Sequence, residues 1–215
     1  MLYFLGDYEG INFFIVALAY ILVIVISLSF HEFAHAFSAY KCGDMTPKMQ
    51  GRVTLNPFKH IDAIGFLCCA FFGFGWAKPV QINSDNFRNI KKGIGWTSVA
   101  GVLMNLFLSF IGCGLFYVMG LLNLNNIFVL FFQQFFYFMF IINVSLAVFN
   151  FLPIYPLDGF KFVENYTSYN NSYVKFVRNN GGWILLVVRH SLHTRSRNRR
   201  YWQHLSRPLG NTCRS

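Results

Sequence analysis

The chain has 215 residues, of which 55% are hydrophobic and only 12% charged, and it contains 27 phenylalanines. No Lys, Arg, Asp or Glu occurs between Gly93 and Leu157. This composition argues against a soluble globular fold and predicts an all-α polytopic protein embedded in the lipid bilayer of the cell membrane. The net charge of +10 does not indicate a nucleic-acid partner, because residues 189–215 concentrate seven arginines without an acid.

The first apolar run, predicted as a helix over about residues 12–40, contains the sequence His31-Glu32-Phe33-Ala34-His35. On a helix this spacing places two imidazoles on one face, where they can share a metal ion. Glu32 lies beside the first histidine, where it can act as a general base. Ionisable residues at membrane depth are costly and by default mark a function. The alternative is that both histidines are polar residues at a helix end near the lipid headgroups.

Residues 46–57 alternate β-branched residues with turn formers, which predicts a short strand or hairpin at the membrane surface. The next apolar segment, residues 61–77, is too short after Asp62 to cross a hydrocarbon core of about 30 Å. Basic residues lie on both sides of it, including Lys59 and Lys78. This pattern favours an embedded re-entrant loop whose two ends face the same side. A short true span is the alternative.

Two more apolar helices are predicted, at about residues 94–121 and 127–150. The stretch from Asn150 to Gly159 then breaks the helix with two prolines and supplies the carboxylate of Asp158. A catalytic zinc ion usually has three protein ligands, so two histidines need one more donor. Asp158 is the best candidate, because the proline-rich break ends a span on the predicted cytoplasmic side. The alternative is that Leu157-Asp158-Gly159 is only a turn.

The distribution of Lys and Arg predicts the orientation of the chain in the membrane. With the basic loops inside, the N-terminus is external and residues 41–93 lie at the cytoplasmic side. His31 follows eighteen apolar residues, about 27 Å along the first helix, which places it in the cytoplasmic part of that helix. Asp158 emerges on the same side. The active site is therefore expected toward the cytoplasm.

Four motifs, in this order along the chain, resemble the site-2 protease family of intramembrane zinc metalloproteases, particularly its short bacterial members. They are His31-Glu32-Phe33-Ala34-His35; Gly51 to Pro57 with His60-Ile61-Asp62; Gly75-Trp76-Ala77-Lys78-Pro79-Val80; and Asn150 to Gly159. The resemblance implies a three-helix catalytic core and hydrolysis of peptide bonds in transmembrane protein substrates. It also implies one Zn²⁺ per chain, bound by His31, His35 and Asp158, with Glu32 activating water.

The family often carries Ala-Gly-Pro-x-x-Asn on its middle core helix, and the matching stretch here runs from Ala100 to Asn105. Val102 replaces the proline, which leaves a local break of this helix open. Asn105 and Asn150 are candidates for polar support of the site, but each can equally be an interhelical hydrogen-bond partner. Two other functions remain as alternatives: a transporter or channel with broken helices, and an inactive homologue that acts as a binding module.

These features assign residues 1–180 to one intramembrane metalloprotease domain. Residues 181–215 change character, because an apolar start that is too short to span a membrane leads into an arginine-rich segment without Lys or Phe. We hypothesise that a frameshift or an aberrant gene end replaced an apolar continuation. The alternative is a genuine basic tail that binds anionic lipid.

Overall fold

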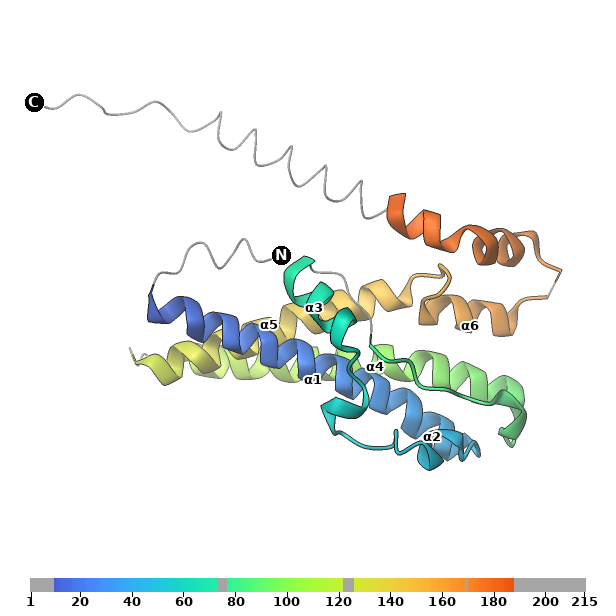
Figure 1. The fold of residues 1–215 in the computed structure, drawn as a ribbon, viewed down its shortest axis with the longest axis horizontal. Helices are drawn as coiled ribbons and strands as arrows, with labels where there is room; N and C mark the ends of the chain where they lie inside the picture. Colours follow the sequence, from blue (N-terminus) through green and yellow to red (C-terminus); the bar gives the residue numbers. More distant parts are fainter. Residues whose placement is uncertain (1–9, 73–76, 122–125, 169, 188–215) are drawn as a thin grey trace, which may run out of the picture.

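Three long helices dominate the chain: α1 (Ile11–Cys42), α4 (Ile90–Leu121) and α5 (Ile127–Phe151). A computed structural model describes residues 10–72, 77–121, 126–168 and 170–187. Each long helix is apolar and long enough to cross a membrane. Figure 1 shows the three helices side by side. The three predicted helices are confirmed, and the described residues form an all-helical structure.

The three helices share an apolar core. It is built from Val16, Ala19, Tyr20, Val23 and Ile24 of α1, Leu108 of α4, and Phe138, Met139 and Ile142 of α5. Large apolar side chains also cover the outer faces of the bundle; Phe110 is 80% exposed and Phe128 is 72% exposed. A bundle that is apolar both inside and outside is suited to a lipid environment, because exposed apolar patches of this extent are unfavourable in water.

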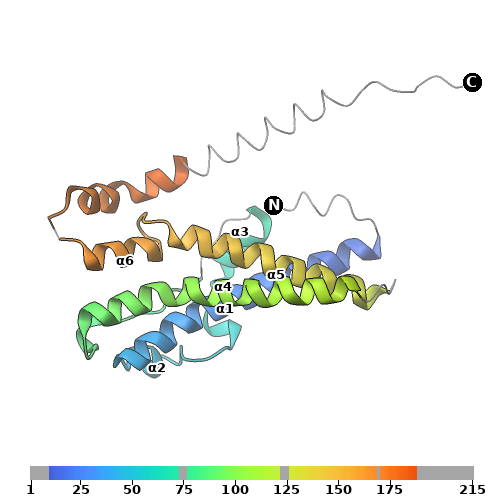
Figure 2. The same cartoon turned by 180° about the vertical axis from the view of Figure 1, so that it is seen from behind.

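Short elements gather at the end of the bundle where α1 ends and α4 begins (Figures 1 and 2). They include α2 (Thr46–Met49), which packs against α1, and α6 (Asp158–Tyr166), which packs against α4. The turn η3 (Ser84–Asn86) also contacts α4. This end of the molecule therefore brings together segments from the beginning, middle and end of the described chain.

The short strand or hairpin predicted within residues 46–57 is wrong. After α2 this segment forms turns and bends that lead into the turn η2 (Pro57–Lys59). The Asn56 side chain accepts a hydrogen bond from Phe58 N at 3.0 Å and caps η2. Further along, His60 Nε2 lies 2.7 Å from the carbonyl oxygen of Thr54. These local contacts between side chains and backbone compete with the pairing that a strand would need.

Residues 61–77 begin and end beside each other. Ile61 and Ala77 form an isolated antiparallel bridge, and Lys78 N donates to His60 O at 2.7 Å. Between them lies α3 (Ala63–Phe72), a helix of ten residues and therefore about 15 Å long. That length is about half of a hydrocarbon core. Residues 73–76 lie outside the described part of the chain.

Residues 172–187 form a further helix that packs on α6 (Figure 2). Phe160 of α6 contacts Val174 and Val177 in a small second core. This helix crosses residue 180, the position at which the sequence predicts a domain boundary. Residues 188–215, to which the frameshift hypothesis mainly applies, lie outside the described residues.

Candidate metal centre

Two histidines of α1 point into the bundle one turn apart. His31 and His35 are each 6% exposed, and their Nε2 atoms lie 3.1 Å apart. Gly101 of α4 packs directly against both rings: a β-carbon at this position would lie 2.4 Å from His35 Nε2 and 2.5 Å from His31 Cε1. Only a residue without a side chain allows α4 to approach this closely.

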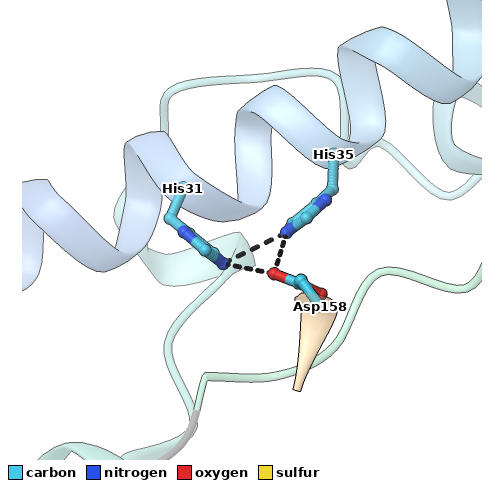
Figure 3. A group of neighbouring side chains, drawn as sticks. All are labelled: His31, His35 and Asp158. Carbon is cyan, nitrogen blue, oxygen red and sulfur yellow. Dashed lines mark hydrogen bonds and ion pairs between the residues drawn. The ribbon is translucent and has the colours of Figure 1, made fainter. Parts of the chain in front are cut away.

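The carboxylate of Asp158 faces the two imidazoles from the first residue of α6, as Figure 3 shows. Its Oδ2 atom lies 2.9 Å from His35 Nε2 and 3.2 Å from His31 Nε2. The next residue, Gly159, allows α6 to begin close to the end of α5, because a β-carbon there would lie 2.2 Å from the carbonyl oxygen of Phe151. The proline-rich break therefore delivers the carboxylate that the sequence predicts.

These three side chains suit a zinc ion. Two imidazole nitrogens and one carboxylate oxygen form a donor set that catalytic zinc sites use. The donor atoms of His31, His35 and Asp158 all lie within 4.8 Å of one another. Their separations of 2.9 to 3.2 Å are close to the roughly 3.3 Å between two ligands of a tetrahedral zinc ion at bond lengths of about 2.0–2.1 Å.

The surroundings of Asp158 favour its ionised form. Burial raises the pKa of this carboxyl, but attraction to His35, hydrogen bonds from both imidazoles and the charge of Lys161 outweigh burial, so the pKa lies well below its ordinary value. Asp158 is therefore a carboxylate at neutral pH, which is the form that binds a metal ion.

Two of the three donor groups also make a polar contact through an atom other than the one that faces the proposed metal. His35 Nδ1 lies 2.7 Å from the carbonyl oxygen of Thr97 on α4. Lys161, one turn along α6, donates from Nζ to Asp158 Oδ1 at 2.9 Å. Such outer partners orient metal ligands and keep a histidine in one tautomer.

A cavity with a volume of about 660 Å³ is lined by His31, His35 and Asp158. Glu32 lines this cavity as well. Its Oε2 atom accepts a hydrogen bond from Val80 N at 3.3 Å. Val80 belongs to residues 78–83, a stretch without regular structure that follows the bridge at Ala77. The cavity therefore has the histidine helix on one side and this stretch of backbone on another.

The two asparagines that the sequence suggests as polar support lie in different places relative to the cavity. Asn150 lines the cavity and donates from Nδ2 to Leu146 O at 3.0 Å, within α5. Asn105 is fully buried in α4 and is not among the residues that line the cavity. α4 runs without interruption through Val102, so replacement of the family's proline leaves a continuous helix.

Sequence reasoning missed Asp44, which follows the end of α1. Asp44 is completely buried; its Oδ1 atom accepts from Thr46 N and from Asn86 Nδ2, both at 3.0 Å, and its Oδ2 atom accepts from Asn83 N at 2.8 Å. The carboxylate thus ties the end of α1 to the segment that continues from Val80. Its position two residues before Thr46-Pro47 is a helix-start signal that could have drawn attention to it.

The other acid and histidine near the apolar segments have structural roles. Asp62 Oδ1 accepts from Gly65 N at 2.8 Å at the start of α3. His60 is completely buried, with its ring against the carbonyl oxygen of Thr54. Neither belongs to the group of donors around Asp158.

A bundle of membrane-length helices that encloses two histidines, a carboxylate donor and a second carboxylate contains the groups that a membrane-embedded metalloprotease requires. Comparisons with known proteins give the same class. Residues 117–188 match peptidase family M50. YwhC, a candidate zinc metalloprotease of Bacillus subtilis (strain 168), is 40% identical over 147 residues, which cover 67% of each chain.

A second relative is Rip2, a candidate zinc metalloprotease of Mycolicibacterium smegmatis (strain ATCC 700084 / mc(2)155). It is 29% identical over 182 residues, which cover 79% of this chain and 66% of Rip2. No solved structure matches the chain. The chain belongs to peptidase family M50, the site-2 protease family of intramembrane zinc metalloproteases.

Proposed function

We propose that this protein is a zinc endopeptidase that cuts transmembrane proteins within the membrane. The observation that carries this proposal is the meeting of His31, His35 and Asp158 at one cavity that Glu32 also lines, inside a bundle of three membrane-length helices. The complete set of donors and base argues against an inactive homologue.

In this proposal His31, His35 and Asp158 hold one Zn²⁺, and Glu32 is the general base. Zinc, when bound, lowers the pKa of a coordinated water to about 7 and polarises the carbonyl of a peptide bond. Glu32 takes a proton from the attacking water and returns it to the leaving amine. Its hydrogen bond from Val80 N engages Oε2 and orients the carboxylate.

The cavity supports access of water and of an extended substrate segment. A peptide bond in a membrane helix is already hydrogen-bonded and dry, so hydrolysis requires local unwinding and delivery of water. Glu32, Lys161 and Asn150 give the cavity a polar side. Asn150 is proposed as a polar group that contacts substrate or water there, because it reaches the cavity. Asn105 is proposed as polar support outside it.

The orientation and the domain limits follow from the sequence and are part of the proposal. Residues 1–180 form the metalloprotease domain, and its active site faces the cytoplasm, where the positive-inside pattern places the basic loops. Residues 61–77 are proposed as a re-entrant segment. The bridge between Ile61 and Ala77 supports this, because it brings both ends of the segment to one level.

The proposal is tested by comparing membranes that contain the wild-type protein with membranes that contain Glu32→Gln. Quantitative proteomics should find one or more membrane proteins that are shortened only in the presence of the wild type. The purified wild type should contain about one equivalent of zinc, which a transporter or channel does not require. Identical membrane proteomes, together with a purified wild type that lacks zinc after growth in its presence, would refute the proposal.

A further inference from the structure

The three proposed zinc ligands differ in the partner of their second polar atom, the one that does not face the proposed metal. His35 has the carbonyl oxygen of Thr97, and Asp158 has the ammonium group of Lys161. His31 Nδ1, by contrast, is buried and has no hydrogen-bond partner within the described ranges. A histidine that binds a metal through one ring nitrogen normally donates the other N–H to an acceptor. The set of outer contacts therefore lacks one acceptor.

Asn105 is a second buried group whose hydrogen-bonding capacity is unused. It is 0% exposed, and neither its Oδ1 nor its Nδ2 atom has a partner among the residues that the structure describes. Burial of an unpaired amide is costly, and a membrane interior offers no general solvent to compensate. An asparagine in this state calls for a specific explanation.

The packing of α1 and α4 places Asn105 within about one helical turn of the His31 ring. A β-carbon on Gly101 would lie 2.7 Å from His31 Nδ1, so this part of α4 lies against the His31 ring. Asn105 follows Gly101 by one turn, about 6 Å along the axis. The two helices run in opposite directions (Figure 1). The turn that follows Gly101 therefore lies beside the turn of α1 that precedes His31, which contains Ser27.

Asn143, a second buried asparagine, is paired through its amide nitrogen, while its Oδ1 atom has no partner among the described residues. Asn143 of α5 donates from Nδ2 to Ser27 Oγ at 2.8 Å and to Met139 O at 2.8 Å. Neither polar atom of Asn105 makes such a contact with the described residues. Asn105 and His31 thus offer complementary unused groups, since an amide oxygen accepts and a neutral imidazole N–H donates.

We infer that Asn105 is the positioning residue for His31. With zinc at the site, Asn105 Oδ1 accepts the N–H of His31 Nδ1, directly or through one buried water. The bond fixes the tautomer in which His31 Nε2 faces Asp158 and His35. This inference rests on the proposed zinc site and deepens it, because it gives a role to a buried polar residue that follows Gly101 by one turn and does not line the cavity.

The test uses the purified full-length chain in detergent and two variants of similar shape. Asn105→Leu removes both polar atoms and should weaken zinc binding about 10- to 100-fold in a competition titration with a chelator. It should not lower the unfolding temperature of the zinc-free chain, because the lost amide has no partner there. Asn143→Leu is the matched control: it should lower that unfolding temperature, because it loses the bond to Ser27, and keep wild-type zinc affinity.

Two outcomes of this experiment contradict the inference. Wild-type zinc affinity in Asn105→Leu would overturn the inference, as would equal losses of affinity in both variants. If Asn105→Leu does not fold, Asn105→Ala and Asn105→Ser are compared, and the hydroxyl acceptor should restore part of the affinity. His35→Ala tests the zinc site itself: if the wild type binds zinc no better than His35→Ala, the proposed function fails, whatever Asn105 does.

Discussion

Gly101 and His35 approach each other so closely that a single methyl group on Gly101 would lie 2.4 Å from His35 Nε2. The contact joins the middle of α4 to the metal-binding face of α1. The two proposed histidine ligands therefore pack directly against α4. A substitution on α4, which supplies no ligand, should change the affinity of the site for zinc.

Gly101→Ala should accordingly reduce zinc binding without unfolding the protein. Zinc binding should fall because the added methyl group must displace the His31 and His35 rings. The helix should remain folded because alanine is favoured over glycine within a helix by about 1 kcal/mol. Zinc per chain, measured by mass spectrometry of the purified protein, should fall well below one equivalent. Gly114→Ala on the same helix is the control, because no other described segment of the chain comes within 4 Å of its new β-carbon. Full zinc occupancy in Gly101→Ala would contradict the packing described here.

Glu32→Gln should separate metal binding from hydrolysis. The substitution keeps the shape and the acceptor that faces Val80 N but removes the base, so zinc content should be unchanged while the cleavage rate falls about 10²- to 10⁴-fold. Cleavage of a reconstituted transmembrane substrate measures the rate. Asp85→Asn, an exposed acid outside the cavity, should retain wild-type cleavage. Unchanged proteolysis by Glu32→Gln would mean that another group is the base.

Lys161→Met should weaken zinc binding, because Asp158 Oδ1 loses the donor that orients the carboxylate. Loss of such an outer partner typically costs about 10-fold or more in metal affinity. Lys161→Arg keeps a cationic donor and should remain close to the wild type, and Lys175→Met controls for the loss of a positive charge. Chelator competition gives the affinities. Equal affinities of Lys161→Met and Lys175→Met would show that the ion pair does not orient Asp158.

Asp44 should make stability dependent on pH. Burial raises the pKa of its carboxyl, but hydrogen bonds from Asn86, Thr46 and the backbone of Asn83 lower the pKa below its ordinary value of about 3.8. A lowered pKa contributes stability above the unfolded-state pKa, and this stability is lost as the pH falls through the folded-state value.

Asp44→Ala should therefore lower the unfolding midpoint at pH 7 by roughly 3–6 °C, because hydrogen bonds to a buried carboxylate are lost. The difference from the wild type should shrink as the pH falls below about 4. Thermal unfolding followed by circular dichroism across this range measures both effects. A difference that stays constant down to pH 3 would show that ionised Asp44 does not stabilise the fold.

The topology can be tested by labelling single cysteines in a chain whose five native cysteines are replaced. Cysteines at positions 48, 88 and 161 should react only from the cytoplasmic side, and one at position 124 only from the outside. Positions 48 and 88 lie on either side of residues 61–77. Labelling of these two from opposite sides would turn that segment into a true span.

The sequence predicted what depends on local spacing or helix breaks. The separation of His31 and His35 is a property of a single helix, and the prolines before Asp158 mark a turn wherever they occur. Long apolar runs predicted all three long helices for the same reason. Residues 46–57 were mispredicted because alternation of residue types outweighed the local caps, such as that of Asn56, that direct the backbone into turns.

Contacts between segments that lie far apart along the chain could not be predicted from the sequence. Nothing near Asp44 indicates that its carboxylate accepts from Asn83 and Asn86, about forty residues later. The role of Thr97 is carried by a backbone carbonyl, which every residue type possesses. Gly101 is one of 17 glycines, and its importance lies in the two imidazoles that face it from another helix.

The proposed zinc ligands lie far apart in the order of synthesis, since 123 positions separate His35 from Asp158. A chain that has emerged only as far as α4 holds both histidines and Glu32 but lacks the carboxylate that completes the set. The complete set of proposed donors therefore forms only once α6 has been synthesised and has packed against α4.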